Sequence, residues 1–177
     1  MNDVLNAIAK RSSARAYADT KLTAEEINTL VEAGLQSPTA TNRKEIRFAV
    51  VDGASDIIAE LDKDFKASRS IGDSPVNFMY NAPLLIVISG EDEFKWSKVD
   101  AGIAVQSIAV AAESMGLGNV IIGCIYDVMN GELMGKYNKA FGIPDGYSFE
   151  VAIAVGHKTD AKIPHDYEVS EQVTFVE

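Results

Sequence analysis

The sequence predicts a single domain over residues 1–177 in which helices cover a sheet of apolar strands. A chain of 177 residues with 47% apolar and 24% charged residues has a globular composition and is long enough to bury a core. Short apolar segments typical of buried strands alternate with helical patterns, and no repeat or linker divides the chain. This alternation by itself favours a doubly wound parallel sheet, although a sequence pattern does not fix strand direction.

Each expected helix has an apolar stripe or a recognisable end. In the second helix, Thr23 can accept a hydrogen bond from the amide of Glu26 while Glu26 reaches back, which is a capping box. The fourth is small and apolar all round, which predicts burial on most sides, and glycines at 116 and 118 end it. The expected helices span residues 4–11, 23–36, 55–68, 100–115 and 128–141.

Four apolar segments are expected as strands. The second of them, LLIVIS, is apolar without interruption and follows an irregular stretch, SIGDSPVNFMYNAP. The strands are expected at residues 46–52, 84–89, 119–125 and 148–156.

The charge balance limits the possible partners. With a formal net charge of −10, the chain is predicted to bind neither nucleic acid nor an anionic membrane surface, because long-range repulsion opposes both. The single cysteine, Cys124, excludes an intrachain disulfide and fits a reducing compartment. With no signal-peptide pattern at the N-terminus and no apolar run long enough to span a bilayer, the expected location is the cytoplasm.

Several short motifs fail on spacing or context. GELMGK has only three residues between its glycines and a Tyr where a phosphate loop needs Ser or Thr. GLGN follows a helix and precedes a strand, the reverse of the order in a dinucleotide fingerprint. His157 and His165 with one distant cysteine do not form a zinc set, so no metal is expected. The cations and hydroxyls gathered in KRSSARAY remain to be explained in so acidic a chain.

Four segments in this order resemble the nitroreductase superfamily of flavin mononucleotide (FMN) enzymes: KRSSARAY, SPTATNRKEIRF, DAGIAVQSIAVAAESMGLGNVIIG and VAIAVGHK. The resemblance covers the chain from about Ile8 to Lys158. It implies an α+β fold with a mostly antiparallel sheet surrounded by helices, in place of the parallel sheet favoured by pattern alone. It also implies a homodimer with FMN at the interface and an exchanged C-terminal tail.

The resemblance gives KRSSARAY a role at the cofactor. Arg11 would grip the FMN phosphate with its planar fork, and Ser12 and Ser13 would donate to the phosphate, ribityl chain or ring edge. Arg15 would reach the pyrimidine side, where a cation stabilises the reduced flavin. A simpler role for Arg11, compatible with the first, is to complement the dipole at the end of the first helix. Tyr17 is interpreted as structural.

Two further segments are implied to contact the cofactor. Ser37, Pro38 and Asn42 would lie along it, or would only form a helix stop and turn. Relatives often continue with Gln-Pro-Trp where this chain has Lys-Glu-Ile at 44–46, a departure that affects the pocket edge. Asn77 would match a ring-contacting asparagine of the family, on a looser match.

The remaining contacts come from the end of the third strand and from the tail. A backbone amide at Ile122 or Gly123 would point at flavin N5, while Cys124 is expected to be a small buried hydrophobe with no redox role. Lys158, Lys162 and His165 would supply the cation that completes the phosphate site, or would form an exposed basic loop.

The activity implied is transfer of hydride from NADH or NADPH through flavin N5 to a small-molecule acceptor, such as a nitroaromatic or a quinone, by a ping-pong mechanism. No nucleophile–base pair is found in the sequence, so no side chain is assigned as catalytic. Two alternatives stay open: a specialised FMN enzyme of the dehalogenase or azoline oxidase type, and a non-catalytic FMN-binding protein.

Overall fold

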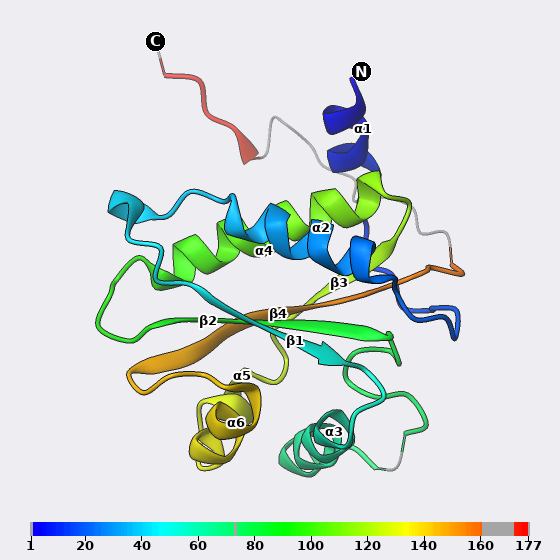
Figure 1. Ribbon diagram of the computed structural model, residues 1–177, viewed down its shortest axis with the longest axis vertical. Helices are drawn as coiled ribbons and strands as arrows, with labels where there is room; N and C mark the ends of the chain where they lie inside the picture. Colours follow the sequence, from blue (N-terminus) through cyan, green and yellow to red (C-terminus); the bar gives the residue numbers. More distant parts are fainter. Residues whose placement is uncertain (1, 73, 161–171, 177) are drawn as a thin grey trace.

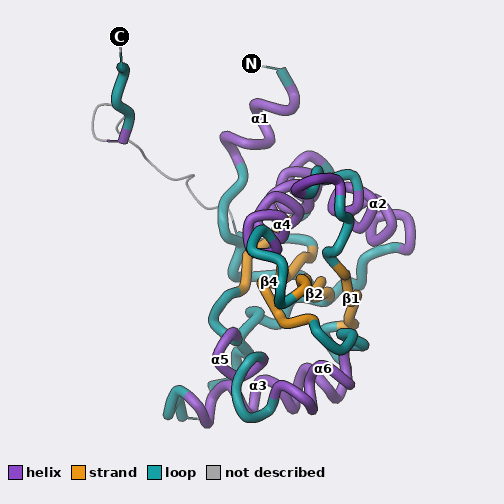
Figure 2. Tube along the Cα trace, turned by 90° about the vertical axis from the view of Figure 1, so that its left-hand side faces the viewer, coloured by secondary structure: helices purple, strands orange, loops and turns teal. Residues whose placement is uncertain are grey.

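The computed structural model describes residues 2–72, 74–160 and 172–176. A four-stranded sheet lies between two layers of helices in this part of the chain (Figures 1 and 2). One face carries α2 and α4, and the other carries α3, α5 and α6. The helices are α1 (Asp3–Lys10), α2 (Ala24–Leu35), α3 (Asp56–Ser68), α4 (Ser97–Ser114), α5 (Tyr126–Met129) and α6 (Met134–Phe141), with a 3-10 turn η1 (Ala40–Asn42). The strands are β1 (Arg47–Asp52), β2 (Leu84–Glu91), β3 (Gly118–Ile122) and β4 (Tyr147–Gly156).

The sheet has the order β1-β2-β4-β3, and every pairing is antiparallel. The parallel arrangement favoured by the alternating pattern is therefore wrong, and the α+β arrangement implied by the family resemblance is confirmed. Asp52 at the end of β1 is paired with Leu84 at the start of β2. The chain thus leaves and re-enters the sheet at the same end. The segment with α3 therefore connects two adjacent antiparallel strands and is not a crossover between parallel ones.

The uninterrupted apolar run of β2 is explained by a core on each face of the sheet. Alternate side chains point to opposite faces of a strand. Leu85 and Val87 pack with α3, α5 and α6 residues, whereas Ile86 and Ile88 pack with α2 and α4. A strand buried on both faces needs no polar alternation, which is the pattern that the sequence shows.

The helix starts follow local signals. The capping box at α2 is present, because Thr23 Oγ1 accepts from the Glu26 amide at 3.2 Å and the Glu26 carboxylate accepts from the Thr23 amide at 2.7 Å. The single helix expected over 128–141 is wrong: α5 and α6 are separate. Asn130 causes the break, since its side chain donates to the carbonyl of Phe149 and accepts from its amide.

Helix α4 is buried on one side only within the protomer. Ala101, Ala104 and Ile108 are inaccessible or nearly so, while Val99 is 50% and Ile103 37% exposed. The expected burial on most sides therefore does not hold for a single chain. Among the described residues, no helix combines the length and apolarity needed to cross a membrane.

Candidate functional site

The KRSSARAY segment is bound by its backbone across one end of the sheet. Ala14 donates to the carbonyl of Asn119 in β3 at 2.9 Å, and Ala18 donates to the carbonyl of His157 after β4 at 2.8 Å. A Cβ added at Gly118 would stand 2.9 Å from the Ala14 Cβ and 2.5 Å from that of Lys158, so glycine permits this close approach. The segment is consequently fixed in place, and its side chains project from a defined position.

Three donors in this segment are available to a ligand. The structure gives no hydrogen bond or ion pair to the side chains of Arg11, Ser12 and Ser13 among the described residues, and all three are half-buried. Arg11 also ends α1, donating its backbone amide to the carbonyl of Ala7. Its position is compatible with both expected roles, because Arg11 is the C-cap residue at the negative end of α1 and its side chain has no anionic partner in the described part of the chain. A cation and two hydroxyls that the described residues leave without partners match the chemistry of a phosphate group.

Arg15 has a different environment from Arg11. Its Nε donates to the hydroxyl of Tyr80 at 3.2 Å, and its guanidinium carbon lies 5.7 Å from the centroid of that ring. Its backbone amide donates to the Asp160 carboxylate. Tyr17, two residues on, donates its hydroxyl to the carbonyl of Ala14, and burial raises the pKa of this phenol. Tyr17 is structural, as the sequence suggested.

A cavity of about 350 Å³ lies beside Tyr80. Its lining includes Asn77 and Cys124. Asn77, the predicted ring contact, and Cys124, which follows Gly123, therefore line the same cavity as Tyr80, the hydrogen-bond partner of Arg15. Cys124 is exposed, which makes the expected burial of this residue wrong. Partial burial of the thiol still raises its pKa, which disfavours a reactive thiolate.

Strand β3 links the two ends of this region. Besides its ladder to β4, it makes one isolated bridge, from Asn119 to Ser13, among the described residues. Gly123 follows the strand about 13 Å farther along, from the rise of a strand, and nothing lies within 4 Å of where its Cβ would be. A ligand along this edge could contact both the N-terminal donors and the backbone at Ile122 and Gly123.

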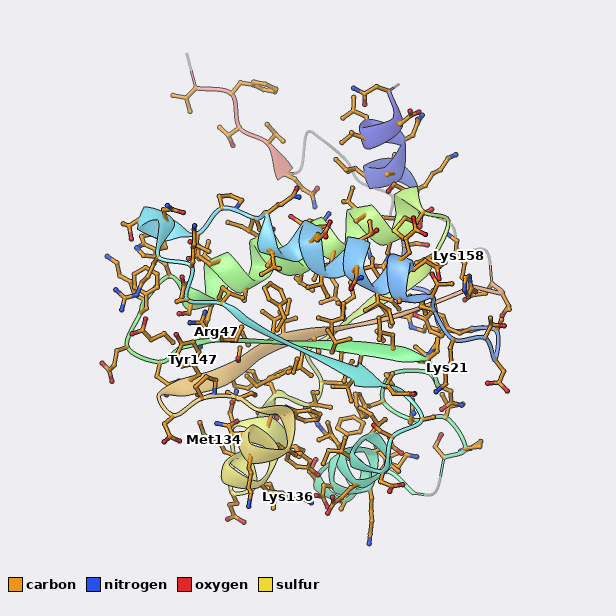
Figure 3. All side chains as sticks on the ribbon, in the orientation of Figure 1. Lys21, Arg47, Met134, Lys136, Tyr147 and Lys158 are labelled. Carbon is orange, nitrogen blue, oxygen red and sulfur yellow. The ribbon has the colours of Figure 1, made fainter. Side chains whose placement is uncertain are left out.

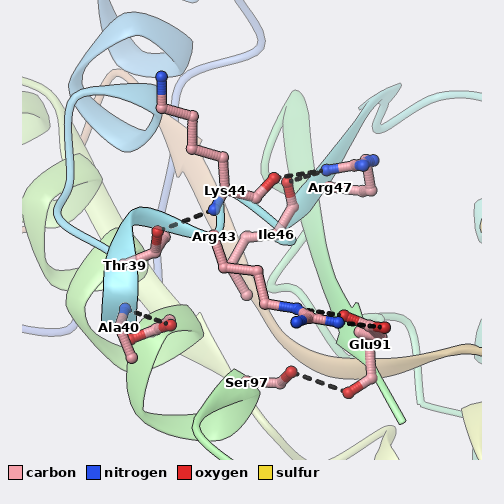
Figure 4. Close-up of polar contacts among 9 residues, drawn as sticks. Thr39, Ala40, Arg43, Lys44, Ile46, Arg47, Glu91 and Ser97 are labelled. Carbon is pink, nitrogen blue, oxygen red and sulfur yellow. Dashed lines mark hydrogen bonds and ion pairs between the residues drawn. The ribbon is translucent and has the colours of Figure 1, made fainter. Parts of the chain in front are cut away.

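A second, larger cavity of about 570 Å³ contains the other predicted segment. Ser37, Pro38 and Asn42 line it, together with apolar side chains of α2, β1 and α4. The polar contacts that shape its rim are drawn in Figure 4. Ala40 donates to the Asp100 carboxylate at 2.9 Å, and Lys44 donates its amide to Thr39 Oγ1. The Ser37 hydroxyl lies 2.8 Å from that of Ser107, so the rim is fixed to α4.

The Lys-Glu-Ile segment at 44–46 contains an unusual buried acid. Glu45 is 2% exposed, and neither of its carboxyl oxygens has a hydrogen-bond donor among the described residues. Burial, and then the neighbouring Asp100, raise the pKa of Glu45. The physical cause of this upward shift is the loss of hydration on burial, together with a second carboxyl group, Asp100, close by.

The predicted site residues occupy two distant places in one protomer. Asp100 marks the cavity at the N-terminal end of α4, and Glu113, near the C-terminal end, binds Lys158 through both carboxylate oxygens at 2.9 Å. Thirteen residues of helix separate them, about 20 Å. Figure 3 likewise places Lys158 at the opposite end of the sheet from Arg47, which lines the larger cavity. A single chain does not bring Ser37, Pro38 and Asn42 to the Arg11–Arg15 donors.

The C-terminal cations are only partly placed. Lys158 is committed to Glu113 in this structure, while Lys162 and His165 lie outside the described residues. The sequence interpretation also missed Tyr80, Asp160 and Glu113. The Asn-x-x-x-Asn spacing around Tyr80 was the available signal, because paired asparagines four residues apart favour a turn, but the partners of Tyr80 and Glu113 are remote in sequence.

Comparison with known proteins identifies the family of this chain. Residues 8–157 match the nitroreductase family. The chain is 30% identical to an FMN reductase (NADPH) of Bacillus subtilis over 89% of its own length, and it spans 66% of the length of that relative.

Solved structures give the same result. A nitroreductase with bound FMN from Desulfitobacterium hafniense superposes with a TM-score of 0.90 at 28% identity, with all of both chains covered. An FMN-dependent nitroreductase from Clostridium difficile superposes with a TM-score of 0.86 at 26% identity, with 99% of each chain covered.

Proposed function

This chain belongs to the nitroreductase family, and from that membership we propose that it is an FMN-dependent oxidoreductase. It takes hydride from NADH or NADPH and passes it to a small-molecule acceptor, such as a nitroaromatic or a quinone, in a ping-pong cycle. FMN supplies the redox chemistry, since its N5 accepts and donates hydride. The observation that carries the proposal is the set of donors at Arg11, Ser12 and Ser13, which have no side-chain partner among the described residues and are fixed against β3 in an otherwise acidic protein.

The residues present fit FMN on two counts. Two hydroxyls and a guanidinium, none with a partner in the described residues, suit a phosphate dianion, and the open approach to Gly123 suits a flat ring held against backbone. Arg15, already oriented by Tyr80, provides a positive charge that favours an anionic ring. The protein thus binds, orients and electrostatically stabilises its cofactor, and no side chain needs to act as nucleophile or base.

We propose that the complete site needs two chains. The segment of Ser37, Pro38 and Asn42 lies about 20 Å along α4 from the Arg15 end of the same protomer. Two copies related by a two-fold axis, with their α4 helices antiparallel, would bring the Asn42 end of one copy to the Arg15 end of the other. The exposed Val99 and Ile103 on α4 supply an apolar face for that contact.

The C-terminal tail is proposed to pack on the partner. Within the described residues, Phe175 is 83% and Val176 91% exposed, and residues 172–176 stand away from the helices and sheet in both views (Figures 1 and 2). Covering apolar side chains this exposed with another protein surface lowers the free energy, because it removes apolar area from water. Exchange of the tail between protomers would provide that surface.

The decisive experiment is anaerobic reduction. The purified protein should carry a yellow flavin that is released as FMN on denaturation, and NADH or NADPH should bleach it. A panel of nitroaromatic and quinone acceptors should then restore the colour. Protein that binds no FMN after incubation with it would refute the proposal, and bound FMN that neither nucleotide reduces would instead favour a flavin-binding protein.

A further inference from the structure

The turn that carries Tyr80 is held in an unfavourable backbone conformation. Tyr80 has φ of 58° and Asn81 has φ of 56°, a left-handed region that costs free energy for residues with a Cβ. Two such residues in succession persist only when the surrounding structure fixes them, and such positions are concentrated at functional sites.

Asn77 supplies the bonds that fix this turn. Its side-chain oxygen accepts from the backbone amides of Met79 at 3.1 Å and of Asn81 at 2.8 Å. The backbone amide of Asn77 in turn donates to the side-chain oxygen of Asn81. Phe78 donates its amide to the Asp62 carboxylate, and Met79 is fully buried. The side-chain oxygen of Asn77, expected at the cofactor, is therefore used to build the turn.

The consequence of the turn is the position of Tyr80 against Arg15. The Tyr80 hydroxyl accepts from Nε at 3.2 Å, and the ring lies 5.7 Å from the guanidinium carbon. Within the described residues the terminal Nη atoms have no partner, and the guanidinium forms no ion pair with a carboxylate. The outer edge of the guanidinium is thus left available at a fixed orientation.

We propose that Tyr80 is a positioning residue that holds Arg15 for the cofactor, acting through the Nε hydrogen bond. This inference rests on the proposed function and adds a residue that it does not include. Tyr80 also lines the cavity that contains Asn77 and Cys124, so the residue that orients Arg15 borders the region next to Gly123. Without the hydroxyl, Arg15 loses its fixed orientation and must be ordered by the ligand.

The test is Tyr80→Phe, which removes the hydroxyl and keeps the ring. We expect the dissociation constant of FMN from the apoprotein, measured by flavin fluorescence, to rise about two- to tenfold, the range for one hydrogen bond. The midpoint potential of the bound flavin should become more negative. Both effects should disappear in an Arg15→Ala background, since Tyr80 acts only through Arg15.

Tyr147→Phe is the matched control. Arg47 lies over the Tyr147 ring at 5.4 Å, and the Tyr147 hydroxyl has no hydrogen bond in the described structure. Tyr147 lines neither the larger cavity nor the cavity beside Tyr80, and the substitution keeps the ring against which Arg47 lies. This variant should leave FMN affinity and potential unchanged.

The outcomes separate the two proposals. If the wild-type protein binds no FMN, the proposed function fails. If the wild-type protein binds FMN and Tyr80→Phe matches it in affinity and potential, only the role of Tyr80 fails. An equal effect of Tyr80→Phe with and without Arg15 would also overturn that role, because it would show that Tyr80 acts on the fold rather than on Arg15.

Discussion

At the scale of residues, two arginines four positions apart have different surroundings. Arg11 ends a helix and has no anionic partner among the described residues, whereas Arg15 is held by Tyr80. The sequence predicted both as cofactor ligands on resemblance alone. The structure adds the physical distinction that Arg15 is oriented in advance and Arg11 is free to close on a phosphate.

Arg11→Ala should weaken FMN binding by about 10- to 150-fold, the cost of one or two hydrogen bonds to a charged group. Arg11→Lys should recover only part of this, since lysine keeps the charge and loses the fork. Fluorescence titration of the apoprotein measures both variants. The control is Lys10→Ala, an exposed cation in the last turn of α1, and an equal loss for this variant would indicate general electrostatic attraction instead of a phosphate contact.

At the scale of elements, side-chain hydrogen bonds at helix ends set helix boundaries that the apolar pattern did not predict. Thr23 and Glu26 start α2 where the capping box predicts. By contrast, Asn130 divides α5 from α6 through hydrogen bonds to Phe149, nineteen residues away. A periodic apolar pattern predicts a helix, but it holds no information on a hydrogen bond to a distant residue that ends the helix early.

The capping box should make the stability of the protein depend on pH. The Thr23 amide lowers the pKa of Glu26, so this stabilisation is present above the ordinary glutamate pKa and is lost as the pH falls through the lowered folded-state value. Glu26→Gln should lower the free energy of unfolding by a few tenths to about 1 kcal/mol at pH 7, and the difference should vanish near pH 2. Thermal unfolding at both pH values measures it.

Glu25→Gln is the control for this prediction, because Glu25 lies in the same first turn but takes no part in the box. At pH 7, Glu25→Gln should lower the free energy of unfolding by less than Glu26→Gln does. Equal losses for the two variants would mean that the charge near the helix start, and not the box, carries the effect.

The exposed face of α4 should carry the dimer contact. Ile103→Glu should convert the dimer to a monomer and release FMN, because a charge buried at an apolar interface is costly. Light scattering and flavin content after gel filtration measure both effects. Leu133→Glu is the control, since Leu133 is equally exposed at 37% but precedes α6 on the other side of the sheet; a dimer that survives Ile103→Glu would contradict the proposed interface.

At the scale of the whole molecule, the two groups of predicted residues define one site only if two chains contribute. The donors near β3 and the cavity near η1 lie at opposite ends of α4, and exposed apolar side chains occur on α4 and on the C-terminal segment, as they also do on α1. Each protomer would then contribute to two sites. The activity and the assembly state should therefore be lost together.

The C-terminal segment gives a test of this dependence. Phe175→Ala combined with Val176→Ala should weaken the dimer about 10-fold or more, since the two side chains are nearly fully exposed in the protomer and each would bury apolar surface on the partner. Sedimentation at several concentrations measures the dissociation constant. The protomer fold should be unaffected by circular dichroism, and an unchanged dissociation constant would exclude tail exchange.

The sequence by itself determined most of the helices and strands, the capping box of α2 and the chemistry of the donor segment. Apolar runs and the pair Thr23 and Glu26 act over a few residues, so local periodicity and spacing are sufficient to predict them. Resemblance then supplied the antiparallel sheet, which the alternating pattern predicted wrongly.

Only the tertiary structure decided how distant segments meet. It brought three pairs of residues into hydrogen-bond contact: Tyr80 with Arg15, Glu113 with Lys158, and Asn130 with Phe149. It also left Cys124 exposed. It also separated Asn42 from the N-terminal donors by most of α4. These outcomes depend on contacts between residues far apart in the chain, whose geometry is set by sheet order and helix packing and therefore leaves no local signal in the sequence.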